Sequence, residues 1–121
     1  GEHNEANAGR GGETLEIQPL AAKGQVTIID FYSPYCPPCV KIAPLLEQLC
    51  EKRRDISVQK VNINRPHVKG IDWGSPLARQ YRLKSVPYFV IFNGKGKMVA
   101  EGREATRQIV DWLKEARIIQ E

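Results

Sequence analysis

Two cysteines spaced three residues apart, Cys36 and Cys39, lie between a strand-like run and a helical pattern. The run at 25–32 (QVTIIDFY) is nearly continuous in β-branched and aromatic residues, which is typical of a strand covered on both faces. From about 38 to 53 apolar residues recur at the spacing of one helix face: Ile42, Leu45, Leu46, Leu49 and Cys50. The pair is therefore predicted where a buried strand ends and a helix begins, which is where reactive groups collect in open α/β folds.

The rest of the chain alternates between strand-like and helix-like segments. We expect strands at 14–17, 56–63, 88–92 and 97–100, at most a turn of helix at 19–23, and helices at 76–82 and 104–116. Strand, helix and strand around the cysteines form a βαβ crossover, and Asn93-Gly94 turns the last two strands into an antiparallel hairpin. This order predicts an α/β fold with a central mixed sheet flanked by helices on both faces.

The 121 residues suit one domain. Residues 1–12 contain almost nothing that could be buried, so we predict a disordered tail or linker there and a domain over 13–121. The net charge is +4, but the basic residues are scattered and no nucleic-acid motif accompanies them. No apolar run approaches the roughly 20 residues that a membrane span requires. We therefore expect no nucleic-acid partner and no membrane span in this chain.

Cys36 should be the attacking thiol. A residue before proline avoids the helical region, so Cys36 is expected just outside the helix, facing the positive end of the helix dipole. That position stabilises the thiolate. Because Pro37 and Pro38 have no backbone N–H, the first donor after Cys36 within the motif is the N–H of Cys39. Cys39, one turn along on the buried side, is the expected resolving thiol.

A C-x-x-C pair can also be half of a zinc site, which needs two more Cys or His ligands. The remaining candidates are Cys50 on the apolar helix face, His3 in the predicted tail and His67 in a loop. Such a scattered set does not favour a metal. No dinucleotide or phosphate-binding motif is present, so no cofactor is expected beyond the cysteine pair itself.

In this setting the stretch Asp30 to Cys39 (DFYSPYCPPC) resembles the thioredoxin superfamily, and more narrowly thioredoxin-like proteins with a CPPC active site. The resemblance covers about 13–116 and implies the thioredoxin fold. Asp30 matches the buried aspartate of the family, and Lys60 matches the lysine that partners it. Val86-Pro87 matches the cis-proline loop.

The resemblance implies thiol–disulfide exchange, most simply the reduction of protein disulfides with electrons from an upstream protein reductase. Asp30 would take the proton from Cys39, and Val86 and Pro87 would bind an extended substrate segment. The alternatives are a structural Asp30 paired with Lys60, and a Pro87 that only opens a strand. A disulfide oxidase or isomerase of the same fold would favour histidine at position 38, which is proline here. A redox-inert binding module is the third possibility, although such modules arise by loss of a cysteine and both are present.

Four features depart from the typical family pattern. Tyr35 stands in place of tryptophan, and Pro37-Pro38 in place of Gly-Pro. The first strand and helix are shortened, and an insertion at 65–74 contains Trp73, which either covers the core or contacts substrate. The shortening and insertion are similar to those of bacterial thioredoxin-like proteins that act outside the cytoplasm. We therefore expect the periplasm or another extracytoplasmic compartment, with the cytoplasm as the alternative. Separately, we expect the chain to be a monomer.

Overall fold

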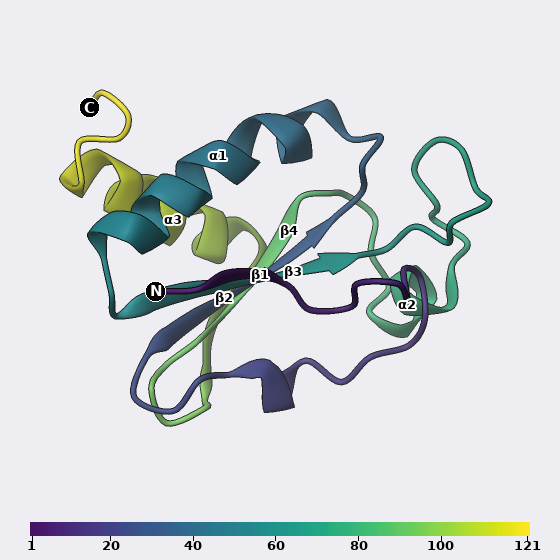
Figure 1. Ribbon diagram of the computed structural model, residues 1–121, viewed down its shortest axis with the longest axis horizontal. Helices are drawn as coiled ribbons and strands as arrows, with labels where there is room; N and C mark the ends of the chain where they lie inside the picture. Colours follow the sequence, from purple (N-terminus) through teal and green to yellow (C-terminus); the bar gives the residue numbers. More distant parts are fainter.

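The central sheet has five strands in the order β1-β3-β2-β4-β5 in the computed structural model, which describes residues 1–121 (Figure 1). The strands are β1 (His3–Glu5), β2 (Val26–Tyr32), β3 (Ile56–Asn62), β4 (Tyr88–Phe92) and β5 (Met98–Glu101). β3 lies parallel to both β1 and β2, whereas β4 is antiparallel to β2 and to β5. The sheet is mixed, as predicted, and β2 is its central strand.

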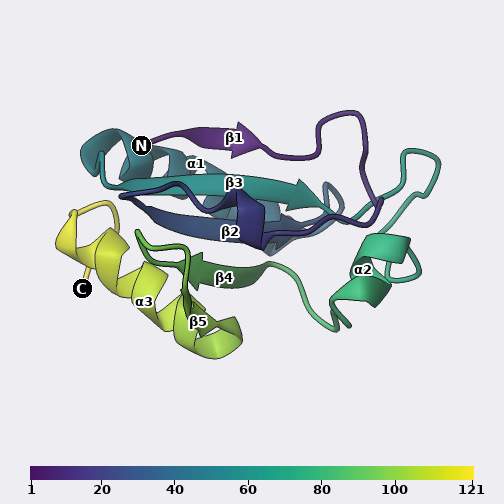
Figure 2. The same cartoon turned by 90° about the horizontal axis from the view of Figure 1, so that it is seen from below.

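Helices cover both faces of this sheet. The long helices α1 (Pro37–Lys52) and α3 (Gly102–Glu115) lie side by side on one face, whereas α2 (Pro76–Gln80) and the 3-10 helix η1 (Gln18–Leu20) lie on the other (Figures 1 and 2). None of the helices combines the length and the apolar character needed to cross a membrane. The architecture is a thioredoxin-type sheet with helices on both sides.

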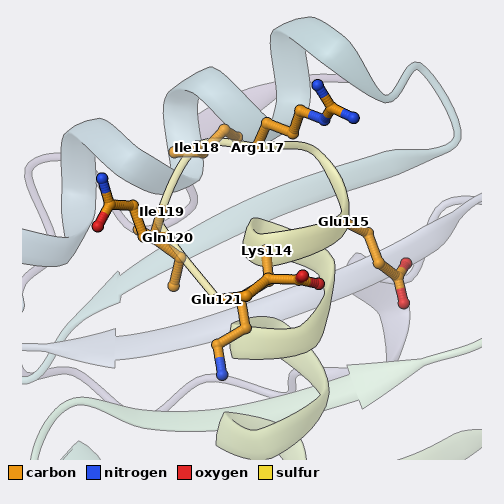
Figure 3. A pocket seen from close by; sticks show the side chains of 7 residues that line it. All are labelled: Lys114, Glu115, Arg117, Ile118, Ile119, Gln120 and Glu121. Carbon is orange, nitrogen blue, oxygen red and sulfur yellow. The ribbon is translucent and has the colours of Figure 1, made fainter.

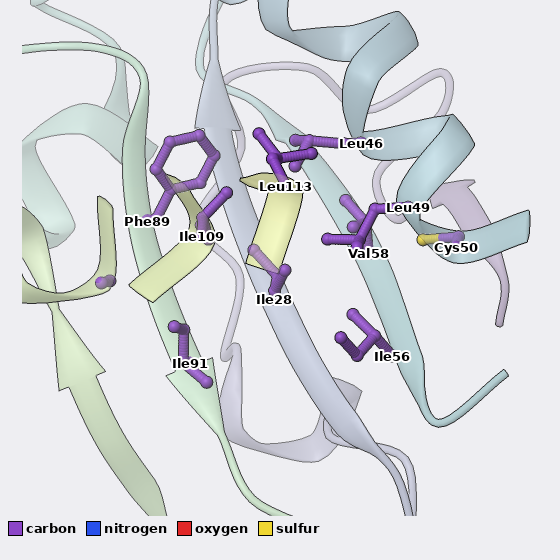
Figure 4. Close-up of a cluster of buried hydrophobic side chains, with 11 residues drawn as sticks. Ile28, Leu46, Leu49, Cys50, Ile56, Val58, Phe89, Ile91, Ile109 and Leu113 are labelled. Atoms are coloured by element: carbon purple, nitrogen blue, oxygen red, sulfur yellow. The ribbon is translucent and has the colours of Figure 1, made fainter. Parts of the chain in front are cut away.

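Alternation along β2 divides the core into two clusters, because successive side chains of a strand point to opposite faces. The cluster beneath α1 and α3 contains Ile28, Leu46, Leu49, Cys50, Ile56, Val58, Phe89, Ile91, Ala105, Ile109 and Leu113 (Figure 4). The opposite cluster contains Ile29, Phe31, Val61, Ile63, Leu77, Ala78, Leu83, Val90 and Phe92. Asp30 is two residues after Ile28 on β2, so its side chain points to the same face, which α1 and α3 cover.

The predicted long helices and the hairpin form close to their predicted bounds, but α2 ends earlier. Arg82 has a φ of 52°, in the left-handed region, and the N–H of Leu83 donates to the carbonyl of Ala78. This is the hydrogen bonding of a helix that stops at a left-handed residue. The helix therefore ends at Gln80.

The amino-terminal segment differs from the prediction of a disordered tail at 1–12. Residues His3–Glu5 form β1 on the edge of the sheet, and the side chain of Asn7 is buried and bonds both backbone groups of Asn62. Backbone pairing with β3 and the Asn7 amide hold this segment, so its lack of apolar residues does not prevent ordering. The sheet therefore begins ten residues before the predicted domain boundary at 13.

The strand expected at 14–17 is not formed. Leu15 and Ile17 instead pack against the α2-side cluster. The N–H of Leu15 donates to the side chain of Gln80, and its carbonyl accepts from the hydroxyl of Tyr81. The alternation of polar and apolar residues at 14–17 therefore reflects side-chain packing on the α2 side of the sheet. The backbone of this segment does not pair with a strand.

Candidate functional site

Cys36 and Cys39 form a disulfide at the amino end of α1, with their Cα atoms 5.2 Å apart. Cys36 is the N-cap residue with an extended backbone, and prolines occupy the first two helical positions. The N–H of Cys39 donates to Cys36 Sγ at 3.2 Å. The next N–H, of Val40, donates to the carbonyl of Cys36. Within the motif, Cys36 Sγ therefore receives one backbone hydrogen bond, which is the one the sequence predicted.

Burial does not distinguish the two cysteines. Cys36 is 2% exposed and Cys39 is 3% exposed. The difference between them is position: Cys36 caps the helix and accepts the hydrogen bond, while Cys39 lies inside the first turn. Two large neighbouring side chains are open to solvent, Tyr35 at 48% and Val40 at 59%. A partner protein would meet these side chains beside the disulfide.

The loop that precedes β4 lies against the cysteine pair. The Val86–Pro87 peptide bond is cis, as the family resemblance implied. Cys36 Sγ lies 3.5 Å from the carbonyl oxygen of Val86. Beside Pro87 is a groove of about 340 Å³, lined by Ser85, Pro87, Tyr88, Gly102, Arg103 and Thr106. The cis-proline loop therefore borders both the reactive sulfur and an open surface.

Asp30 is fully buried in β2, and neither of its carboxylate oxygens has a hydrogen-bond partner in the protein. Burial raises the pKa of Asp30 to about 7; the positive charge of Lys60 opposes this rise and the negative charge of Glu5 adds to it. A carboxyl group with such a pKa can take up or release a proton near neutrality.

Lys60 lies opposite Asp30 in the β2–β3 register, but no ion pair joins them. The Lys60 Nζ atom lies 4.4 Å from the centre of the Tyr32 ring. The Tyr32 hydroxyl in turn donates to the Glu5 carboxylate. The predicted partnership of Lys60 with Asp30 therefore acts at longer range than a salt bridge, because an aromatic ring on the same strand as Asp30 offers the ammonium group a competing cation–π contact.

A network of buried polar side chains that the sequence reading missed ties the insertion to the cysteine loop. The Ser33 hydroxyl donates to Asn64 Oδ1 at 2.7 Å, and Ser33 Oγ accepts from the N–H of Tyr35. Asn64 Nδ2 donates to the carbonyls of Val68 and Gly70, and Asn64 Oδ1 also accepts from the N–H of Asp72. The signal available in the sequence was the pair of turn-forming side chains Asn64 and Asp72 at the two ends of the insertion.

Arg65 closes the insertion by bonding the buried carboxylate of Asp72 with its backbone N–H and two guanidinium nitrogens, at 3.0, 2.9 and 3.1 Å. Hydrogen bonds from Arg65 also hold the pKa of Asp72 below its usual value. Trp73 follows directly and is 42% exposed. The insertion is therefore a closed loop, anchored at Ser33, with a large part of one aromatic side chain open to solvent.

The other sequence candidates lie apart from the disulfide. Cys50 is buried near the end of α1, and burial raises the pKa of its thiol to about 11. His3 lies on β1, with Nδ1 3.8 Å from Glu47. No group of three or more His, Cys, Asp and Glu side chains is arranged to hold a metal ion.

The largest cavity, of about 570 Å³, lies at the carboxyl end of the chain and contains none of the predicted site residues. Its lining consists of Lys114, Glu115, Arg117, Ile118, Ile119, Gln120 and Glu121 (Figure 3). Five of these seven side chains are charged or amidic and come from one surface segment. The cysteine pair with its disulfide lies outside this cavity.

Comparison with known proteins identifies the family of the chain. The family model described as Thioredoxin matches residues 17–115. A thioredoxin-like protein of Fusarium culmorum is 34% identical over 93 residues, which cover 74% of this chain and 69% of that protein. A thioredoxin-like protein of Synechocystis is 31% identical, covering 78% of this chain and 84% of the relative.

Solved structures agree on the fold. The thioredoxin pre-protein of Schistosoma mansoni is 25% identical with a TM-score of 0.61, covering 95% of this chain and 98% of that one. Spinach chloroplast thioredoxin F is 23% identical with a TM-score of 0.64, covering 97% and 95% of the two chains.

Proposed function

This chain belongs to the thioredoxin family, and from that premise we propose that it reduces protein disulfides through a Cys36–Cys39 dithiol–disulfide cycle. The family and the disulfide-forming pair together support thiol–disulfide oxidoreductase activity. The observation that carries the proposal is the place of Cys36 Sγ, at the N-cap of α1 and within reach of the Cys39 N–H. A thiolate at that position is stabilised by the positive end of the helix dipole.

In the proposed cycle the Cys36 thiolate attacks one sulfur of a substrate disulfide. The substrate S–S bond breaks, a mixed disulfide to Cys36 forms, and one substrate thiolate leaves. Cys39 then loses its proton and attacks Cys36 Sγ, which releases the second substrate thiolate. Two electrons have passed to the substrate, and the chain is left with the Cys36–Cys39 disulfide. An upstream protein dithiol would reduce this disulfide again, so no separate cofactor is needed.

Asp30 is the proposed proton acceptor for Cys39. Its carboxyl group is buried on the α1 face of the sheet, its oxygens have no protein partner, and its pKa is raised to about 7. At neutral pH such a group is ionised in a large fraction of molecules and basic enough to accept a proton. Lys60 modulates this carboxyl group through its charge.

For substrate binding we propose the surface around the cis-proline. An extended substrate segment would pair with the backbone of Val86 beside Pro87, in the manner of an added strand, and lie along the adjoining groove. Tyr35, exposed beside Cys36, and Trp73, exposed on the insertion, would contact substrate side chains. Tyr35 and Trp73 contribute only their backbone N–H groups to the hydrogen bonds around the loop. Their side chains are therefore available for substrate.

Reduction is favoured over oxidation by the scarcity of thiolate donors. A strongly oxidising pair is one whose reduced form is stabilised, chiefly by groups that bond the attacking thiolate. Pro37 and Pro38 supply no N–H, and position 38 is not histidine. The thiolate therefore relies on the helix dipole and the N–H of Cys39.

We further propose an extracytoplasmic location of the bacterial thioredoxin-like type. The first helix is reduced to the single turn η1, and the insertion at 65–74 is present, which are the two features behind this expectation. A membrane-impermeant thiol reagent applied to intact cells that express the natural protein tests the location. Labelling of reduced Cys36 in intact cells supports it, and labelling only after lysis assigns the protein to the cytoplasm.

The trapping of mixed disulfides tests the proposed cycle. Cys39→Ser should attack a disulfide-linked peptide and accumulate an adduct on Cys36, because the resolving thiol is missing. Cys36→Ser should form no stable adduct and lose turnover. Mass spectrometry of the quenched reaction locates the adduct, and Cys50→Ser is the matched control that should behave as the unaltered chain. Adducts on Cys39 in the Cys36→Ser variant would reverse the assignment.

A further inference from the structure

Three charged residues on neighbouring strands face α1 from the same side of the sheet. Asp30 on β2 is in register with Lys60 on β3, and Lys60 is in register with Glu5 on β1. Register partners on parallel strands share a face and lie about 5 Å apart. Lys60 therefore lies between two carboxyl groups, one buried at the centre of the sheet and one at its edge.

The Lys60 ammonium group contacts Tyr32, which is bonded to Glu5 on the edge strand. Its Nζ lies 4.4 Å from the Tyr32 ring centre, and the Tyr32 hydroxyl donates to Glu5 Oε1. Tyr32 is two residues from Asp30 on the same strand and so shares its face. The ring therefore supplies a site for the ammonium group that is separate from the Asp30 carboxyl group, and Glu5 holds the ring by its hydroxyl.

We propose that Glu5 and Tyr32 are positioning residues for the resolving step: they hold the Lys60 ammonium group over the Tyr32 ring and away from the Asp30 carboxyl group. The inference rests on the proposed function, in which Asp30 accepts the proton of Cys39. An ammonium group that closed on Asp30 would stabilise the carboxylate and make it a weaker base. The edge strand β1 thereby acts on the redox centre through Glu5.

Other groups around Asp30 do not replace this effect. Its β4 register partner is Phe89, and α3 contributes the apolar residues Ala105 and Ile109 to the same face. From α1, the charged residue on this side is Glu47, which lies at the sheet edge against His3. Burial, followed by the charge of Lys60, lowers the pKa of His3, so this imidazole is neutral near pH 7. Lys60 and Glu5 are the charged groups that act on the pKa of Asp30.

The test is an NMR titration of the Asp30 carboxyl carbon in the reduced full chain. Glu5→Gln should lower the pKa of Asp30 by at least about half a unit, because it removes a negative charge and replaces the charge-assisted hydrogen bond from the Tyr32 hydroxyl with a weaker neutral one, which loosens the hold on Lys60. Glu5→Gln combined with Tyr32→Leu should lower it further, since Asp30 is then the remaining partner for Lys60. Glu47→Gln, which removes an exposed carboxylate of the same face beside His3, is the matched control and should leave the value unchanged.

A Lys60→Met background separates positioning from simple charge repulsion. If Glu5 acts by holding Lys60, the Glu5→Gln shift should be clearly smaller in Lys60→Met than in the unaltered chain. Equal shifts in the two backgrounds, or no shift in either, would overturn the proposal. The titration reports the pKa of Asp30 whether or not the protein reduces disulfides, so failure of the proposed function would appear separately, as unaltered resolution in Asp30→Asn. Glu5 is exposed, so Glu5→Gln should fold normally. The test therefore remains valid even if Tyr32→Leu fails to fold.

Discussion

Asp30 and Lys60 are register partners on the parallel strands β2 and β3, and yet the Lys60 ammonium group lies over the Tyr32 ring instead of pairing with the carboxylate. An ion pair would hold Asp30 ionised and unable to buffer protons near neutrality. Without that pair, burial dominates and raises the pKa of Asp30 to about 7. The separation of these two charges thus connects the packing of the sheet with the proposed proton transfer.

Asp30→Asn should stabilise the protein in a pH-dependent way. The pKa of Asp30 is about 7 in the folded chain, against the ordinary value of 3.8 that we take for the unfolded chain. The folded chain therefore binds the proton more tightly. Stability should therefore fall as pH rises from about 4 to about 7 and stay lower above that range. Asparagine has no such charge, so the variant should gain up to about 4 kcal/mol above pH 7 and little below pH 4.

Urea unfolding at pH 4, 6 and 8 measures this difference. Leu49→Ala, which removes apolar packing from the same face, is the control. Its loss in the free energy of unfolding should not depend on pH. Parallel stability curves for Asp30→Asn and the unaltered chain would mean that Asp30 is already ionised and paired in the folded state.

The same variant should resolve mixed disulfides slowly. Loss of a positioned general base typically reduces a rate by about 100-fold or more, and here the affected step is the attack by Cys39. The initial attack by Cys36 should change much less. Rapid quenching with a model disulfide between pH 6 and 9 separates the two steps. Resolution at the rate of the unaltered chain across that range would leave Asp30 with a structural role only.

Cys50 should be unreactive in the folded, reduced protein. It is buried, and burial raises its pKa to about 11, so little thiolate exists at pH 8. Iodoacetamide should label Cys36 at least about 100-fold faster than Cys50, because the thiolate is the reactive form. Peptide mapping after timed labelling measures both rates, and labelling in denaturant shows that Cys50 can react. Equal rates in the folded protein would contradict its assignment as a spectator.

Asn64→Ala should loosen the insertion and the cysteine loop together. Asn64 bonds Ser33, Asp72 and two loop carbonyls, so its loss leaves several buried polar groups without partners. We expect a loss of about 2 to 4 kcal/mol in stability and faster proteolysis within 65–74. Lys69→Ala, in the same loop, is the control for a surface change. An Asn64→Ala chain with unaltered proteolysis would show that the network does not hold the loop.

Hydrophobic periodicity was sufficient to predict the βαβ unit, the hairpin and the long helices, because those elements bury apolar faces. It failed for β1, where His3–Glu5 is held by backbone pairing at a sheet edge and by the amide of Asn7. The C-x-x-C spacing and the family resemblance located Cys36, Cys39 and the cis Val86–Pro87 bond. The contact of Lys60 with Tyr32 depends on side-chain geometry across three strands, which no local pattern encodes.

The reduction potential of the Cys36–Cys39 couple at pH 7 tests the reductase proposal most directly. It is measured by equilibrating the chain with defined thiol–disulfide buffers and quantifying the oxidised fraction. The scarcity of donors to the Cys36 thiolate predicts a value at or below about −250 mV, close to that of a reducing thioredoxin. A value between about −180 and −120 mV would place the couple among isomerases and oxidases, and would contradict the proposed function.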